Sequence, residues 1–88
     1  MSHRISFEPA AWQQLCDLRR RDHRLGLKVD LLIIAIQRDP RQGEGKPERL
    51  RGDYADHWSR RIDQRNRLIY RILDDTVVIA EIGGHYDD

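Results

Sequence analysis

The 88-residue chain is poor in cysteine, in lysine and in long apolar runs. With a single cysteine, Cys16, no internal disulfide can form, and no cysteine pair is present to bind zinc. The longest apolar run, from Leu31 to Ile36, is too short to cross a bilayer, and no apolar run of signal-peptide length lies near the N-terminus. We therefore expect a soluble, cytoplasmic protein.

Charged residues make up 35% of the chain, yet the net charge is only +1 because 16 basic residues nearly balance 15 acidic ones. Fourteen of the basic residues are arginine, and only Lys28 and Lys46 are lysine. The guanidinium fork of arginine suits phosphate better than the lysine ammonium does. The composition therefore fits a phosphate-binding surface, although a solvated surface of ion pairs would have the same composition.

Apolar periodicity predicts a strand and two helices in the first half of the chain. Residues 3–7 alternate as in a strand, and Pro9 suits the first turn of a helix that runs to about Arg21. Residues 25–38 carry a helical apolar stripe, and Asp39-Pro40 ends this second helix because proline disfavours helical geometry in the residue before it. The tight link between the helices predicts that they pack antiparallel.

A loop and three strands are predicted in the second half. Residues 40–47 hold two prolines and two glycines and are predicted to be a loop. The predicted strands are residues 58–62, 67–73 and 76–82, separated by turns near 63–66 and at 74–75. The sequence thus predicts one α+β domain over residues 1–88, with two helices on one face of a twisted antiparallel sheet. The other face carries arginines and is free to bind a partner.

The polar residues of the second half match what RNA cleavage without a metal or other cofactor requires. A base must take the proton of the 2′-hydroxyl, an acid must protonate the leaving 5′-oxygen, and cations must stabilise the charged phosphorane. Glu48 could be the base, His85 could exchange protons near neutral pH, and Tyr86 could stack on a nucleobase. The available cations are Lys46, Arg60, Arg61, Arg65 and Arg67.

Each of these residues also has an ordinary structural explanation. Glu48 could be one surface carboxylate among many, His85 a terminal residue, and the arginines strand charges that pair with acidic side chains. Other chemistries find less support, because the chain has no glycine-rich phosphate loop before a helix and its four histidines are not spaced as metal ligands.

Four separated motifs occur together: GKPERL at 45–50, WSRRI at 58–62, NRLIY at 66–70 and a late HY pair at 85–86. In this order the motifs closely resemble the YoeB/Txe family, which belongs to the RelE-like and ParE-like bacterial toxins. The resemblance implies a RelE-like, microbial-ribonuclease fold and a toxin of a type II toxin–antitoxin system. Such toxins act on the 70S ribosome as endoribonucleases that cleave mRNA in the A site, are neutralised by a cognate YefM-like antitoxin, and often form homodimers.

The resemblance also implies a role for individual residues. Glu48 corresponds to the general base acting on the 2′-hydroxyl, Arg67 to the cation that stabilises the phosphorane, and His85 to the general acid for the 5′-oxygen. Tyr86 corresponds to a residue that orients the substrate. The family pattern further suggests phosphate contacts, which here are Lys46 and Arg61.

A second function remains open, because ParE-like toxins of the same fold inhibit DNA gyrase without cutting RNA, and a shared fold does not settle function. A third is an interaction domain whose arginine face only receives an acidic antitoxin. The presence of Glu48, Arg67 and His85 together favours the nuclease.

Three positions depart from the family pattern. Asn66 stands where the family has histidine before the Arg-Leu pair. Gly83-Gly84 replaces bulkier residues before His85, which is expected to loosen the last strand. The chain continues with Asp87-Asp88, and two carboxylates there would favour a protonated imidazole while repelling RNA.

Overall fold

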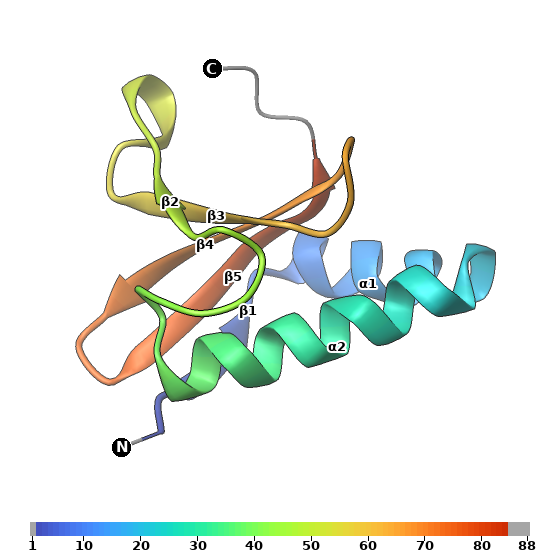
Figure 1. Cartoon of the computed structure of the whole chain (residues 1–88), viewed down its shortest axis with the longest axis horizontal. Helices are drawn as coiled ribbons and strands as arrows, with labels where there is room; N and C mark the ends of the chain where they lie inside the picture. Colours follow the sequence, from blue (N-terminus) through green and yellow to red (C-terminus); the bar gives the residue numbers. More distant parts are fainter. Residues whose placement is uncertain (1, 85–88) are drawn as a thin grey trace.

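The computed structural model describes residues 2–84, in which two helices cover one face of a five-stranded sheet (Figure 1). The elements in chain order are β1 (Arg4–Phe7), α1 (Pro9–Arg21), α2 (His23–Arg38), β2 (Glu48–Arg49), the one-turn 3₁₀ helix η1 (Gly52–Tyr54), β3 (His57–Arg61), β4 (Arg67–Leu73) and β5 (Thr76–Gly84). This order confirms the predicted α+β class, while β2 and η1 are too short to give a sequence signal.

The two helices form a hairpin joined by one residue. In α1 the buried side chains are Ala11, Leu15 and Leu18, at helical spacing. Asp22 ends α1 and caps α2, since its carboxylate accepts a hydrogen bond from the backbone N–H of Leu25 (3.1 Å). That cap starts α2 at His23, so the link is shorter than the sequence predicted.

The sheet is mixed, with strand order β1-β5-β4-β3-β2. The pairs β3–β4 and β4–β5 are antiparallel hairpins, as predicted, and β2 adds to the outer edge of β3. The first strand, β1, pairs parallel with β5 at the opposite edge, with Arg4 opposite Thr76. The helical hairpin therefore connects β1 to the rest of the sheet while covering its inner face (Figure 1).

Strand alternation separates the inner face, against the helices, from an outer face. On β4, Leu68 and Tyr70 are completely buried in the main core, whereas Arg67 and Arg71 have the opposite parity. The core residues are Ala11, Leu15, Leu18, Val29, Leu32, Ile36, Ile62, Leu68, Tyr70, Val77, Ile79 and Ile82. Within residues 2–84, neither helix has the length and hydrophobicity needed to span a membrane.

A β-bulge lies at the end of β5. Arg67 pairs with Gly84 and Leu68 pairs with Ile82, so Gly83 is an extra residue with φ of +85°. The backbone N–H of Ile82 instead donates a hydrogen bond to the side-chain oxygen of Gln14 on α1 (2.8 Å). Gly83, which was expected to loosen this strand, therefore adopts the positive φ that the bulge requires, and β5 continues to Gly84.

Candidate active site

The outer face of the sheet brings Glu48, Arg61 and Arg67 together. Arg61 on β3 lies directly opposite Arg67 on β4, and Glu48 on β2 lies opposite Ser59, two residues from Arg61. Directly opposite residues have Cβ atoms about 4.5–5.5 Å apart, and diagonal neighbours remain within reach of long side chains. A carboxylate and two guanidinium groups therefore share one small area of the face.

The surroundings leave this area open to a ligand. Glu48 and Arg61 are exposed and Arg67 is half-buried, while Ser59 between them is small and buried. Two arginines directly opposite each other repel, which costs stability unless an anion binds between them. No ion pair joins Arg61 or Arg67 to an acidic side chain within the described part of the chain.

A tight turn before β4 positions Arg67. The carboxylate of Asp63 accepts hydrogen bonds from the backbone N–H groups of Arg65 (2.8 Å) and Asn66 (2.6 Å) and from the Asn66 side-chain amide (3.0 Å). The bond from the Asn66 N–H is the largest influence that lowers the pKa of Asp63 below its usual 3.8. Asn66, the departure from the family's histidine, thus closes the turn that leads into Arg67.

The two predicted phosphate contacts, Lys46 and Arg61, line one hollow of about 430 Å³. Lys28 and Leu31 of α2 border the same hollow, beside the loop that precedes β2. Lys46 has a left-handed backbone with φ of 52°, a conformation that few non-glycine residues adopt. The loop therefore delivers an ammonium group next to the exposed guanidinium of Arg61.

Arg60 does not belong to this cationic area, so its inclusion among the cations available for the phosphorane was wrong. Its side chain is completely buried on the inner face, with the same parity as Trp58 and Ile62. The guanidinium donates to backbone carbonyl oxygens of the loop after α2 and to the hydroxyl of Tyr70. The sequence placed Arg60 and Arg61 on opposite faces but did not show which face was covered.

His85 and Tyr86 lie outside the described residues. Gly84, the last described residue, is the register partner of Arg67, and His85 follows Gly84 in the sequence. Arg65, the remaining candidate cation, is exposed in the turn before β4. Among residues 2–84 no cluster of three or more histidine, cysteine or acidic side chains could hold a metal ion.

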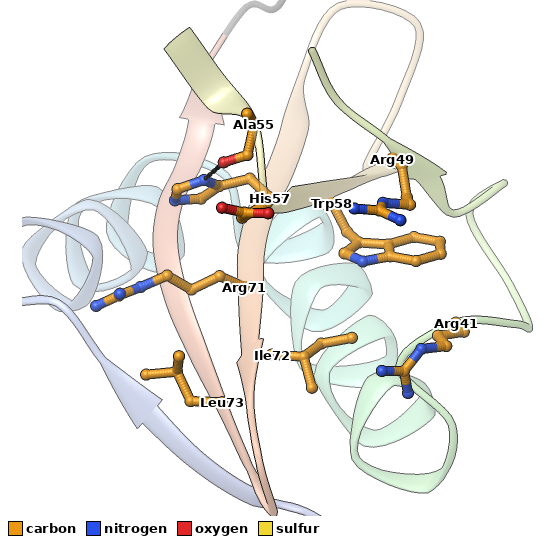
Figure 2. A pocket seen from close by; sticks show the side chains of 9 residues that line it. Arg41, Arg49, Ala55, His57, Trp58, Arg71, Ile72 and Leu73 are labelled. Carbon is orange, nitrogen blue, oxygen red and sulfur yellow. Dashed lines mark hydrogen bonds between the residues drawn. The ribbon is translucent and has the colours of Figure 1, made fainter. Parts of the chain in front are cut away.

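A second cationic surface, formed by Arg41, Arg49 and Arg71 and not predicted from the sequence, lies at the other end of β3 and β4 (Figure 2). Here β4 extends beyond the start of β3, since the last β3–β4 pair is His57 with Arg71. The hollow encloses about 460 Å³, and Figure 2 shows Arg49 beside Trp58, its cross-strand partner. Arg71 is already paired with Glu8 (3.1 Å). No sequence motif brings these arginines together; the register of β2, β3 and β4 and the path of the loop after α2 do.

A family model and several related proteins assign the chain to the same family. Residues 7–86 match the model of the YoeB-like toxin of bacterial type II toxin–antitoxin systems. The chain belongs to this family. Toxin YoeB of Streptomyces coelicolor is 41% identical over 94% of the chain and 99% of the relative. Toxin RelK of Mycobacterium tuberculosis is 42% identical over 93% of the chain and 96% of the relative.

Solved structures of YoeB toxins have the same fold. The YoeB/ParE toxin from Agrobacterium tumefaciens has a TM-score of 0.87 and 33% identity, covering 94% of this chain and 99% of its own. The YoeB dimer from Staphylococcus aureus has a TM-score of 0.87 and 31% identity, covering 98% and 100%. The Staphylococcus aureus toxin has also been solved in a heterotetrameric YoeB–YefM toxin–antitoxin complex, with a TM-score of 0.85. The protein is thus a YoeB-like toxin of a type II toxin–antitoxin system.

Proposed function

We propose that this YoeB-like toxin is a ribosome-dependent, metal-independent endoribonuclease that cleaves mRNA in the ribosomal A site and so inhibits translation. The observation that carries the proposal is the outer-face arrangement of Glu48 beside the opposed pair Arg61 and Arg67. Two like charges held directly opposite each other are unfavourable in the free protein and become favourable when a phosphate lies between them.

In the proposed reaction, Glu48 is the general base and His85 the general acid. The Glu48 carboxylate takes the proton of the 2′-hydroxyl, and the 2′-oxygen attacks the adjacent phosphorus. Arg67, with Arg61 and Lys46, stabilises the negative charge of the phosphorane. His85 gives a proton to the departing 5′-oxygen, which leaves a 2′,3′-cyclic phosphate and a free 5′-hydroxyl, and Tyr86 orients the substrate.

The proposed partners follow from the family and from the charge of the surface. The relatives solved as a YoeB–YefM complex and as a YoeB dimer suggest that this chain binds a YefM-like antitoxin and forms a homodimer. The second cationic surface, with Arg41 and Arg49, is suited to the phosphates of a ribosome-bound RNA. The 70S ribosome and its mRNA place the proposed activity in the cytoplasm.

The test is expression of the toxin in growing bacteria, followed by primer extension on total mRNA. We expect growth arrest and discrete cuts at codons with the wild type, and at least a hundredfold fewer cuts with Glu48→Ala or His85→Ala, since one group in acid–base catalysis contributes roughly 10²–10⁴-fold. Asp53→Asn, which neutralises an exposed carboxylate on η1, is the control and should cut like the wild type.

Two results would count against the proposal. Equal cutting by the wild type, Glu48→Ala and His85→Ala would show that the roles are wrong. Growth arrest with DNA damage and without mRNA cuts would instead identify a gyrase inhibitor of the ParE-like type.

A further inference from the structure

We propose that Arg60 and Tyr70 are positioning residues that fix the loop of residues 39–47, and that this loop in turn sets where Lys46 lies beside Arg61 and where Glu48 enters the outer face. The inference rests on the proposed nuclease function and extends it to two buried side chains that touch no substrate. Neither Arg60 nor Tyr70 faces the site, since both lie on the inner face of the sheet.

The guanidinium of Arg60 is a buried cation without an acidic partner. Its side chain is 0% exposed, and among residues 2–84 no carboxylate lies within 4.0 Å of its nitrogens. Because arginine stays charged in proteins, burial requires that its donors be satisfied. They are satisfied by the carbonyl oxygens of Asp39 (2.7 Å), Gln42 (2.8 Å) and Glu44 (3.0 Å).

Tyr70 completes the arrangement from the neighbouring strand. Its hydroxyl accepts a hydrogen bond from Nε of Arg60 (3.0 Å) and donates one to the carbonyl oxygen of Pro40 (2.6 Å). Burial raises the pKa of the Tyr70 hydroxyl, so the hydroxyl keeps its proton and remains a donor at neutral pH. Two side chains thus hold four carbonyl groups of one loop.

The loop passes so close to Arg60 that an added Cβ would be crowded at two glycine positions. A Cβ on Gly43 would lie 3.1 Å from the Nη1 atom of Arg60, and a Cβ on Gly45 would lie 2.9 Å from Leu32 and 3.1 Å from the Cβ of Arg60. Both glycines have positive φ, +117° and +87°. The loop path is therefore fixed by contact with Arg60 and not only by its own turns.

The fixed path ends at the candidate site. The carbonyl oxygen of Gly45 accepts a hydrogen bond from the backbone N–H of Arg61 (2.7 Å), and Lys46 follows with its left-handed backbone. Glu48 then pairs with Ser59, the residue before Arg60. The chain from Asp39 to Glu48 is thus tied at both ends and along its length to β3 and β4, so release of Arg60 would free the segment that carries the proposed base. A displacement of about 1 Å at a reacting group can lower a rate about a hundredfold.

The experiment uses two conservative variants of the full chain, Tyr70→Phe and Arg60→Lys, with Ile79→Val as a matched core control. Tyr70→Phe keeps the ring but removes the hydroxyl, and with it the hydrogen bonds to Arg60 and to the carbonyl oxygen of Pro40. Arg60→Lys keeps the positive charge but loses the planar set of guanidinium donors. Ile79→Val removes one buried methylene directly opposite Tyr70, so it disturbs the same part of the core without removing a hydrogen bond to the loop. Three quantities are measured for each: the melting temperature, amide hydrogen exchange of residues 42–48, and kcat and KM for cleavage of mRNA on programmed ribosomes.

We expect Tyr70→Phe to lower kcat at least tenfold with less than a threefold change in KM, together with faster exchange at residues 42–48, and Arg60→Lys to show the same pattern more strongly. Ile79→Val should lose a similar number of degrees in melting temperature but keep its kcat and its loop exchange. The proposal is overturned if Tyr70→Phe and Ile79→Val have the same kcat at matched stability, or if loop exchange is unchanged. A wild type that cleaves no ribosome-bound mRNA would overturn the proposed function instead, and the exchange data would still decide whether the two side chains hold the loop.

Discussion

At the scale of single residues, neighbouring arginines in the WSRRI motif have opposite roles because a strand alternates between faces. Arg60 is buried against the helices, whereas Arg61 is exposed beside Arg67. Alternation was readable in the sequence and correctly separated the two residues. Which face the helices cover was not readable, since both faces carry apolar side chains and arginines, and a completely buried arginine is rare.

The opposed pair Arg61 and Arg67 predicts a trade-off between stability and activity. Removal of one charge in Arg67→Gln relieves a repulsion between directly opposite residues, so the free energy of unfolding should be unchanged or rise by about 0.2–0.5 kcal/mol. Cleavage of ribosome-bound mRNA should fall at least tenfold, because a cation facing the phosphorane is lost. Urea unfolding and a cleavage assay on the same preparation measure both effects. A variant that loses more than about 1 kcal/mol of stability would show that Arg67 is structural.

Asp63 predicts a pH dependence of stability. Its pKa is lowered in the folded protein, so the folded state binds its proton more weakly than the unfolded state does. The resulting stabilisation is fully present above the ordinary value near 3.8 and is lost as the pH falls below it. After solvent screening, we expect Asp63→Ala to cost up to about 1 kcal/mol at pH 7.

The measurement is urea unfolding of the wild type and Asp63→Ala at pH 7, 5 and 3. The difference in free energy of unfolding should be equal at pH 7 and pH 5 and should shrink at pH 3. A difference that stays constant down to pH 3 would show that the carboxylate charge does not stabilise the turn.

At the scale of elements, the long periodic segments were predictable and the short ones were not. Both helices and the strands β3, β4 and β5 follow from apolar periodicity and turn residues. The two-residue β2 exists because the loop that precedes it is held against β3, a tertiary cause that leaves no local pattern. Since Glu48 lies on β2, the motif GKPERL located the candidate base, but only the register shows that it shares a face with Arg61.

The segment after β2 builds a small second cluster on the outer face. Leu50 and Ile69 are buried there, although both have outer-face parity. Tyr54 of η1 reaches across the face to donate a hydrogen bond to the carboxylate of Glu81 on β5 (3.2 Å). Part of the face expected to be free for a partner is therefore covered by the chain itself, and the open part is the end that carries Glu48, Arg61 and Arg67.

The bulge in β5 predicts that adding a methyl group at Gly83 lowers both stability and activity. In Gly83→Ala the new Cβ has room, since its nearest contact is the side-chain oxygen of Asn66 at 3.9 Å, but the backbone φ of +85° becomes strained. We expect a loss of about 1–2 kcal/mol in free energy of unfolding. Cleavage should fall as well, because the bulge sets the pairing of Gly84 with Arg67.

The matched control is Gly52→Ala, also at positive φ and with no atom within 4 Å of the added Cβ, but on η1 and outside the pairing of Gly84 with Arg67. It should lose stability without a comparable loss of cleavage. Unchanged stability in Gly83→Ala would mean that β5 can pair with β4 equally well without the bulge.

At the scale of the whole molecule, the chain divides its arginines between structure and binding. The composition indicated an arginine-rich surface and the motifs indicated the family, and both are consistent with the fold. What the sequence could not supply is the division itself: one guanidinium lies inside, two face each other beside a carboxylate, and Arg41 and Arg49 line a hollow at the far end of β3 and β4. These placements depend on register and on which face the helices cover.

The most direct test of the central claim is a single-turnover assay with purified toxin, ribosomes carrying a defined A-site codon, and a labelled mRNA. The account predicts one cut within that codon, no cut of the same mRNA without ribosomes, and at least a hundredfold slower cutting by Glu48→Gln at unchanged ribosome binding. Cutting by Glu48→Gln at the wild-type rate, or equal cutting of free mRNA, would contradict the account.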